Sequence, residues 1–322
     1  MTLPVLSDVI AAAGRLRERI VRTPLISSAS LSTTQASSIF LKLETRQTTG
    51  SFKLRGVTNT LLLSGQAAKG FVAASTGNHA RALAYAAQQM GKPCVVCMSK
   101  LVPENKISAV RALGADIKII GSSQDDAQEE VDRLVLSEGL LPVPPFDDKR
   151  VIAGQGTIAL EILEDRPEVD TLLVPLSGGG LAGGVAMAAK SVKPSIRVVG
   201  VSMKKGAAMA ASLQAGKPVA VTEEPTLADS LGGGIGIPNH YTFNLCQTYL
   251  DDIILLTEEE IGAGIGHAYW QEQEIVEGAG AVGIAALLAR KVRPSGTVAV
   301  VVSGRNIDMT VHQKPVSEYQ KI

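Results

Sequence analysis

Short apolar runs rich in β-branched residues recur along the 322-residue chain and alternate with longer stretches of helical periodicity. The runs that we predict as strands are Phe71–Ala74, Cys94–Met98, Ile117–Ile120, Thr171–Leu176, Ile196–Val201, Ile253–Leu256 and Thr297–Val302. The stretches that we predict as helices include Asn78–Met90, Glu104–Leu113, Gln124–Leu136, Leu181–Val192, Glu258–Ile275 and Ala281–Val292. Buried runs that alternate with helices of about 10–15 residues indicate βαβ units and a mainly parallel sheet. The pattern therefore predicts an α/β fold.

Polar residues mark where two of the helices begin. The first twenty residues form an amphipathic pattern, and we predict a helix there with Ser7 as its N-cap. Ser123 precedes Gln124, Asp125 and Asp126, which is an S-x-x-D capping arrangement. The two acidic residues also complement the positive end of the helix dipole.

A break in the chain is predicted at Leu141–Arg150, which contains three prolines. Proline interrupts both helices and sheets, so this segment indicates a change of domain. We place a smaller lobe at residues 50–147 and a larger lobe at residues 1–49 plus 148–322. Two units are also what a chain of this length suggests, at about 150 residues per domain.

Composition narrows the classes of function. Thirty-one basic residues balance thirty-one acidic ones, which argues against nucleic acid or an anionic membrane as the main partner. No apolar run reaches the roughly 18 residues that span a bilayer. Cys94, Cys97 and Cys246 are too few for a disulfide framework, and alternate facing in a strand makes the first two core thiols. We expect a cytoplasmic protein with a small-molecule partner.

The strongest chemical feature is the glycine turn in Thr171–Gly184, TLLVPLSGGGLAGG. Glycines let the backbone approach a phosphate, which the free N–H groups of the following helix can bind. Gly178, Gly180 and Gly183 satisfy the dinucleotide pattern G-x-G-x-x-G. The acidic ribose ligand expected about 20 residues later is missing, which disfavours NAD and leaves NADP as a weak option. A turn that only permits close packing is the structural alternative.

A second junction between strand and helix contains Ser75, Thr76, Gly77, Asn78 and His79. Such a junction directs several N–H groups at one point and suits a small anion such as a carboxylate. Ordinary N-capping by one of the two hydroxyls explains the same residues.

Two further segments carry candidate chemistry. In GSFKLRG, Lys53 lies between Phe52 and Leu54, and a desolvated lysine can attack a carbonyl to form a Schiff base. A solvated surface lysine is the alternative for this position alone. In TVAVVVSGRNID, a strand delivers Ser303 and Asn306 at its carboxyl end, where open α/β sheets bind ligands. A simple turn or helix cap fits that segment equally well.

Taken together, these segments resemble the fold-type II pyridoxal-phosphate enzymes, in particular the threonine/serine dehydratase and serine racemase family. The resemblance extends over nearly the whole chain through RTPL, KLETRQTTGSFKLRG, ASTGNHARALA, VIAGQGTIALEIL, PLSGGGLAGG, TLADSL, VEGAGAVGIAAL and VVSGRNID. It implies a fold like that of the tryptophan synthase β subunit, with two open, twisted, mainly parallel sheets flanked by helices. The cofactor would lie between the large and the small domain, and a homodimer is expected.

The resemblance also implies roles for individual residues. Lys53 would bind pyridoxal 5′-phosphate covalently and remove the Cα proton. Asn78 would bind the phenolic oxygen of the cofactor, and Ser303 would face its pyridine nitrogen. The other implied cofactor contacts are Phe52, Ser177, Gly178, Gly179, Gly180, Leu181 and Glu277. The implied substrate contacts are Ser75, Thr76, Gly77, Asn78, His79 and Arg305.

The implied reaction is β-elimination of water from a hydroxy amino acid such as L-threonine or L-serine, giving a 2-oxo acid and ammonia. A neutral serine at the pyridine nitrogen leaves that nitrogen largely unprotonated, which we expect to favour prompt loss of the β-hydroxyl. A racemase that uses Lys53 and Thr76 on opposite faces of the substrate is the nearest alternative. A non-catalytic protein that binds a phosphometabolite through the glycine turn is an alternative from another class.

Several positions depart from the usual family pattern. Ser202 and Ala208 replace the Glu and Asp of the metal-dependent members, so we expect no metal site. Arg305 replaces a glycine in the usual S-G-G-N motif. A contact with a second anionic group of the substrate and a surface salt bridge are equally good interpretations of this arginine. SGRNID and VEGAGAVG are similar to the dehydratases of hydroxyectoine utilisation, which points to an amino acid derived from hydroxyectoine.

Overall fold

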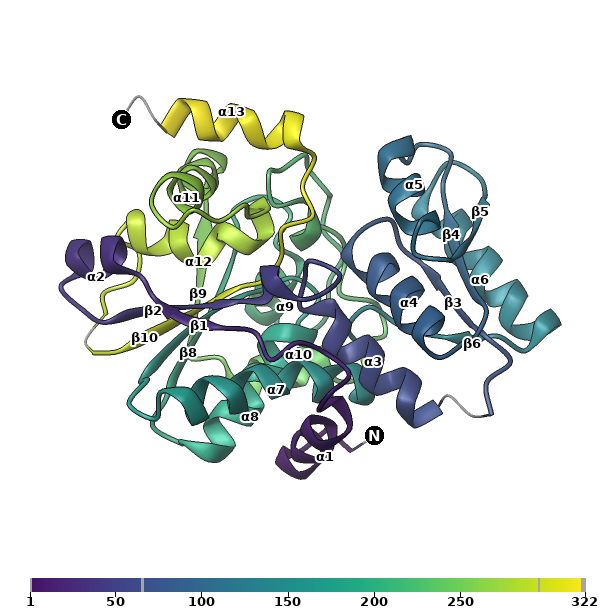
Figure 1. The fold of residues 1–322 in the computed structure, drawn as a ribbon, viewed down its shortest axis with the longest axis horizontal. Coiled ribbons are helices and arrows are strands. Elements are labelled where there is room, and N and C mark those ends of the chain that lie inside the picture. Colours follow the sequence, from purple (N-terminus) through teal and green to yellow (C-terminus); the bar gives the residue numbers. More distant parts are fainter. Residues whose placement is uncertain (1, 65–66, 295, 320–322) are drawn as a thin grey trace.

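The structure, a computed structural model, describes residues 2–64, 67–294 and 296–319 and contains two separate β-sheets (Figure 1). The larger sheet has the spatial order β1 (Leu25–Ser27), β2 (Ile39–Leu43), β10 (Val298–Val302), β7 (Thr171–Pro175), β8 (Arg197–Met203) and β9 (Asp252–Leu256). Strand β1 pairs antiparallel with β2, and the other neighbours pair in parallel. The smaller sheet is parallel throughout, in the order β5 (Asp116–Ile119), β4 (Cys94–Met98), β3 (Phe71–Ala74) and β6 (Leu141–Pro142).

Helices cover both faces of the six-stranded sheet, because its buried strands are apolar on both sides. One face packs against α2 (Ala29–Gln35), α11 (Glu258–Trp270), α12 (Gly278–Leu288) and α13 (Met309–Tyr319). The opposite face packs against α1 (Leu6–Leu16), α7 (Lys149–Asp165), α8 (Gly180–Val192), α9 (Ala208–Ala215) and α10 (Thr242–Tyr249). Short 3-10 turns, η1 (Glu44–Arg46) and η2 (Asp229–Leu231), complete this half.

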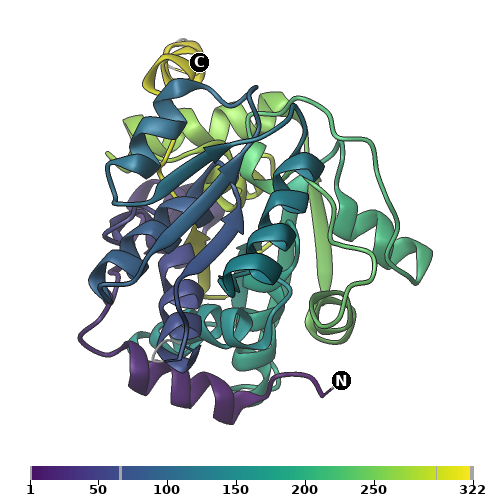
Figure 2. The same ribbon diagram turned by 90° about the vertical axis from the view of Figure 1, so that its right-hand side faces the viewer.

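The four-stranded sheet is likewise sandwiched between helices. Its first face carries α3 (Lys53–Ser64), α4 (Asn78–Gln89) and α5 (Glu104–Arg111), and its second carries α6 (Gln124–Glu138). Figure 2 looks onto this half, drawn in blue, which lies in front of the other half. Helix α3 packs against both α4 and α7 and so connects the two halves. The lobe boundaries at residues 49/50 and 147/148 stay a prediction.

The predicted α/β architecture with two mainly parallel sheets is confirmed. All seven predicted strands are present, and their ends differ from the prediction by two residues or fewer. Ser123 caps α6, since its hydroxyl accepts from the Asp126 N–H at 3.0 Å and the Asp126 carboxylate accepts from the Ser123 N–H. Cys94 and Cys97 are buried in different clusters on the two faces of the smaller sheet, as alternation along a strand requires.

Some predicted boundaries are wrong. Helix α1 begins at Leu6 with Val5 as its N-cap, so Ser7 lies inside the first turn; the Asp8 carboxylate accepts from the Val5 N–H at 2.9 Å. Helix α11 ends at Trp270, five residues early. Strands β1, β2 and β6 and helix α7 were not predicted. Lys42 places a charge inside β2, and α7 contains two interior glycines that weaken a helical signal.

Among the described residues, no helix combines the length and apolarity needed to cross a membrane.

Candidate active site

The chain enters α3 through a tight junction with the end of β10. Gly50 has a φ of +76°, which an L side chain rarely adopts. The Phe52 N–H donates to the Ser303 carbonyl at 3.0 Å, and Ser51 forms an isolated bridge with Gly304. Lys53, the first residue of α3, therefore lies beside the strand end that carries Ser303.

A buried ionic cluster anchors the same turn of α3. Arg55 is fully buried and binds both oxygens of Glu44, at 2.8 and 2.9 Å, and both oxygens of Glu161, at 2.6 and 2.8 Å. Lys42 adds a fourth charge, 2.6 Å from the Glu161 carboxylate. The two cations balance the two anions, and they fix the start of α3 against β2, η1 and α7.

Lys53 itself donates to the carbonyl of Pro145 at 2.7 Å and lies 5.3 Å from the centre of the Phe52 ring. Part of the side chain remains accessible to solvent, but its ammonium lies deep enough to lose hydration. Burial lowers the pKa of Lys53 to about 8, against the opposing attraction of the Glu277 carboxylate. A substantial fraction of the amine is therefore unprotonated and nucleophilic near neutral pH.

The loop before α4 does not use its hydroxyls as caps. Gly77 is the N-cap residue of α4 and forms no side-chain cap bond, so the capping interpretation of Ser75 and Thr76 is wrong. Both hydroxyl residues are half-buried. The first N–H groups of the twelve-residue α4 lack acceptors within the helix, which makes them available to an anion.

His79, in the first turn of α4, is neutral. Burial, and next the charge of Lys53, lower the pKa of His79 to about 3. Its Nε2 lies 2.7 Å from the Val143 carbonyl, which can only accept, so the proton is on Nε2. The Nδ1 atom is then an acceptor, and it is buried with no hydrogen-bond partner among the residues that the structure describes. Any contact of His79 with a carboxylate would come from its backbone N–H and not from a charged ring.

Asn78, the first residue of α4, joins the two halves of the molecule. Its Nδ2 donates to Glu277 Oε1 at 2.7 Å, and its Oδ1 accepts from Asn306 Nδ2 at 2.6 Å. Glu277 is buried before α12, and Asn306 follows β10. Burial, and next the charge of Asp229, raise the pKa of Glu277 to about 7.

The glycine turn between β7 and α8 contacts the segment that binds Lys53. A Cβ on Gly178 would lie 2.5 Å from the Phe146 ring, and one on Gly180 would lie 2.9 Å from the same residue. Gly179 has a φ of +87° and precedes α8 with no side-chain cap. The close-packing interpretation of these glycines is thus observed, and the uncapped N–H groups of α8 are also free for a phosphate. Ser177 is half-buried and Leu181 is buried at this turn.

The segment Val143–Asp147 connects all of these parts, although sequence reasoning assigned it only to a domain break. Val143 accepts from His79, Pro145 accepts from Lys53, and Phe146 packs on the glycine turn. The carboxylate of Asp147 accepts from three backbone N–H groups where α10 begins, at 2.6 to 3.0 Å. The three prolines of Leu141–Arg150 were the only signal in the sequence, and they indicate a domain break and not a site.

Two predicted residues follow β10 but differ in exposure. Ser303 is buried, and its hydroxyl donates to the Ala279 carbonyl at 3.4 Å. Arg305 is exposed, and its backbone N–H donates to the Gly50 carbonyl at 2.9 Å. The structure therefore brings Ser303 to the Lys53 junction, whereas the Arg305 side chain faces solvent.

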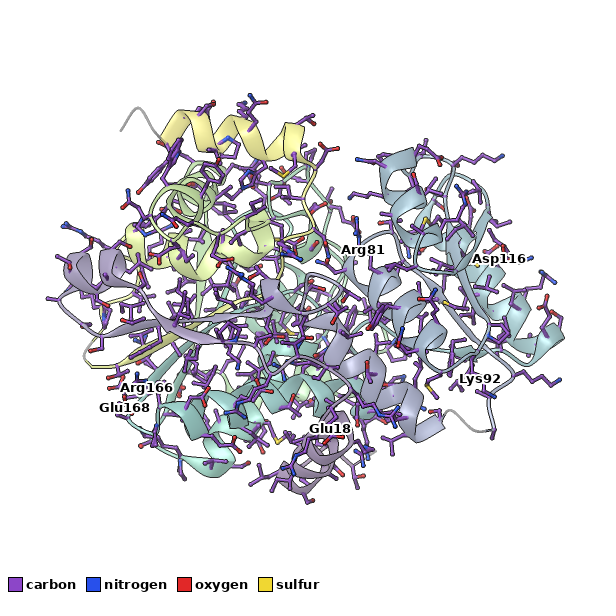
Figure 3. The ribbon with its side chains drawn as sticks, viewed as in Figure 1. Glu18, Arg81, Lys92, Asp116, Arg166 and Glu168 are labelled. Carbon is purple, nitrogen blue, oxygen red and sulfur yellow. The ribbon has the colours of Figure 1, made fainter. Side chains whose placement is uncertain are left out.

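Arg81 is a further charged residue near the site that the sequence analysis did not select. It lies one turn after Asn78 in α4, on the side of that half that faces the six-stranded sheet (Figure 3). It is half-buried, and burial lowers the pKa of Arg81 while Glu277 opposes the shift. Its position becomes recognisable only after the helical phase of α4 is known.

Comparison with known proteins agrees with this geometry. A family model described as "Pyridoxal-phosphate dependent enzyme" matches residues 16–304. The chain belongs to this family. It is 55% identical to a "Putative threonine dehydratase" of Sinorhizobium fredii, with 97% of this chain and 95% of the relative covered. It is 41% identical to the L-threonine ammonia-lyase of Thermotoga maritima, with 97% and 78% covered. The solved structure of maize serine racemase superposes with a TM-score of 0.92 at 32% identity, with 99% of each chain covered.

Family membership identifies pyridoxal phosphate, and neither NAD nor NADP, as the cofactor of this enzyme. The residues present fit that group. The uncapped start of α8, which follows the glycine turn, supplies N–H donors for a phosphate. Lys53 supplies an amine of lowered pKa, and buried Ser51 Oγ and His79 Nδ1 have no partner in the described part of the protein.

Proposed function

We propose that this enzyme removes water from a β-hydroxy amino acid and releases a 2-oxo acid and ammonia. The observation that carries the proposal is the convergence of Lys53, the uncapped start of α4 and the glycine turn on the segment Val143–Phe146. Relatives named as threonine dehydratase and L-threonine ammonia-lyase support the same reaction.

Two parts of the site would bind the substrate and accept its Cα proton. The N–H groups at the start of α4, beside Ser75, Thr76 and Gly77, bind the substrate carboxylate. Lys53, held at the Pro145 carbonyl, is close enough to its neutral form to accept the Cα proton. The cofactor supplies the electron sink that makes this proton acidic.

The remaining contacts hold the cofactor ring and its phosphate. Residues 177–181 at the start of α8 bind the phosphate. Phe52 would flank the ring, Asn78 would donate to its phenolic oxygen, and buried Ser303 would face its pyridine nitrogen. Glu277 acts through Asn78, to which it is hydrogen-bonded.

The finer proposal concerns the substrate. Beside L-threonine and L-serine, we propose an amino acid derived from hydroxyectoine, on the motifs SGRNID and VEGAGAVG. Arg305 would contact a second anionic group from its exposed position two residues after Ser303. We further propose a homodimer in the cytoplasm.

A racemase is the second candidate. Thr76 places a half-buried hydroxyl on the loop before α4, and the similarity to maize serine racemase favours testing this activity. Lys53 and Thr76 would then exchange the Cα proton on opposite faces of the substrate.

The test is to measure release of 2-oxo acid and ammonia from the cofactor-loaded enzyme with four substrates. These are L-threonine, L-serine, 3-hydroxyaspartate and a hydroxyectoine-derived diamino acid. Release from threonine or serine establishes a general dehydratase and makes Arg305 incidental. Release from the modified substrate alone establishes a specialised lyase, in which Arg305→Ala should raise KM. No release from any of them, with loss of chirality in deuterated water, replaces the dehydratase by the racemase.

A further inference from the structure

The side-chain amide of Asn78 has its orientation fixed by two neighbours. An amide offers one oxygen acceptor and two N–H donors. Its oxygen accepts from Asn306 Nδ2 at 2.6 Å, and one N–H donates to Glu277 Oε1 at 2.7 Å. Asn306 Nδ2 also donates to the Thr49 carbonyl at 2.8 Å. One N–H of Asn78 remains outside this chain of hydrogen bonds.

The direction of the chain follows from its ends. The Thr49 carbonyl can only accept, so it requires the NH2 group of Asn306. That NH2 group in turn requires the oxygen of Asn78, because two donors would repel each other. An ionised Glu277 can only accept, so it requires the NH2 group of Asn78. Rotating the Asn78 amide by half a turn would break both contacts.

The backbone is shaped around the two residues that hold Asn78. A Cβ on Gly50 would lie 2.7 Å from Asn306 Oδ1, and Gly50 also has a positive φ of 76°. A Cβ on Gly304 would collide with Glu277 Oε1. These glycines lie three residues before Lys53 and directly after Ser303. The hydrogen-bonded chain therefore occupies space between the two segments that carry the cofactor contacts.

We propose that Asn306 and Glu277 are positioning residues that lock the Asn78 amide with its second N–H available to the cofactor. This inference rests on the contact proposed above between Asn78 and the phenolic oxygen of pyridoxal phosphate. In this role Asn306 and Glu277 act through Asn78 and are not catalytic residues.

The first test compares two substitutions of Asn306, one that removes its contact with the Asn78 amide and one that reverses that amide. In Asn306→Ala the amide loses one restraint, and we expect the dissociation constant for pyridoxal phosphate to rise about tenfold. In Asn306→Asp a carboxylate demands the NH2 group of Asn78 and reverses the amide. We expect the dissociation constant of that variant to rise on the order of 100-fold, with a shifted visible absorbance of the bound cofactor.

A double variant separates positioning from folding. In Asn306→Asp combined with Glu277→Gln, the new Gln NH2 can donate to the reversed oxygen of Asn78. The Tm of the cofactor-free protein should rise above that of Asn306→Asp alone, because the Asn78 oxygen regains a donor. It should stay below that of the wild type, because the Thr49 carbonyl has lost the donor that Asn306 supplied. Cofactor affinity should stay weak, because an oxygen now replaces the N–H offered to the cofactor.

The matched control is Asn105→Ala, which removes another bond between the two halves, from Asn105 Nδ2 to Asp308 at 2.6 Å. It should leave cofactor affinity unchanged. Wild-type affinity and absorbance in Asn306→Asp would overturn the proposal, as would affinities that follow the Tm of the cofactor-free protein in every variant. Cofactor titration needs no substrate, so failure of the proposed dehydratase reaction leaves this result interpretable.

Discussion

At the scale of single residues, burial shifts the pKa values of three groups around the proposed cofactor site. His79 is neutral because burial and Lys53 lower the pKa of its ring to about 3. Burial brings the pKa of Lys53 down to about 8 and the pKa of Glu277 up to about 7. Lys53 and Glu277 therefore change charge within the range in which an enzyme works.

The first prediction concerns the pH dependence of cofactor uptake. The neutral amine of Lys53 is the nucleophile, so the rate at which cofactor-free protein takes up pyridoxal phosphate should rise with pH and level off above about 8. Glu277 is ionised at that pH and raises the pKa of Lys53. Glu277→Gln should therefore move the midpoint to lower pH. The measurement is the uptake rate by absorbance across pH 6–10 (about 0.5-unit steps), and an upward shift would contradict the charge assignment.

The second prediction concerns the hydroxyl of Ser303. A neutral donor at this buried position leaves the pyridine nitrogen largely unprotonated, whereas the carboxylate in Ser303→Asp would retain a proton there. A protonated ring holds negative charge longer, so we expect slower elimination and more racemisation or transamination per turnover. Chiral chromatography of the products from L-serine measures this partition. An unchanged partition in a variant that still binds the cofactor would refute the role of Ser303.

At the scale of elements, α3 and α7 are in contact along a seam of glycines that sets the position of Lys53. A Cβ on Gly154 of α7 would lie 2.6 Å from the Gly56 Cα and 2.7 Å from the Arg55 carbonyl oxygen. Both of those atoms are backbone and cannot rotate away. The helices can lie this close only because both positions lack side chains.

The third prediction follows from this seam. Gly154→Ala should separate α3 from α7, lower the free energy of unfolding by about 1–3 kcal/mol and reduce elimination by displacing Lys53. The matched control is Gly14→Ala in α1, where a Cβ meets no atom within 4 Å. There the change should be neutral or should stabilise the protein by up to about 1 kcal/mol. Urea unfolding measures the free energy of unfolding of both variants. Equal changes in Gly154→Ala and Gly14→Ala would exclude steric separation of α3 and α7 as the cause.

Elements with a clean local signal were predictable, and elements that depend on a distant partner were not. The buried strand β10 is apolar throughout, and Ser123 carries its own capping partner three residues later. Strand β2 contains Lys42, which is tolerated only because Glu161 neutralises it from α7. Gly154 is one of the two glycines that weaken the helical pattern of α7, and α3 packs directly against it. The periodicity of the sequence does not indicate that Glu161 pairs with Lys42 or that α3 packs against α7.

At the scale of the whole molecule, the site is assembled from segments far apart in the chain. Lys53, Asn78 and Ser303 could be selected as candidates from the sequence because each lies in a motif that the family resemblance makes recognisable. Pro145 is 92 residues from Lys53, and Asn306 is 228 residues from Asn78. Their roles come from an ordinary carbonyl and an ordinary amide, which carry no chemical signature until the fold brings them together.

The buried ionic cluster shows the same long-range assembly and gives the last prediction. Arg55→Met would leave Glu44 and Glu161 buried without their main partner, and we expect a loss of about 3–5 kcal/mol in the free energy of unfolding at pH 7. Arg22→Met is the matched control, because Arg22 also pairs with two carboxylates, Glu164 and Asp165, but half of its side chain is exposed. That variant should lose less than about 1 kcal/mol.

The loss of stability in Arg55→Met can come from the charge of Arg55 or from the packing of its stem, and its pH dependence distinguishes the two. In the wild type Arg55 is the main group that holds the pKa of Glu161 below 4.5 despite burial, so this stabilisation is present above that pH and is lost as the pH falls. Without Arg55 the buried Glu161 carboxylate binds a proton more readily, and protonation relieves the cost of its burial. The gap between Arg55→Met and wild type should therefore narrow as the pH falls from 7 towards 4.5. Urea unfolding at several pH values measures the gap, and a constant gap would assign the loss to packing of the Arg55 stem and not to its charge.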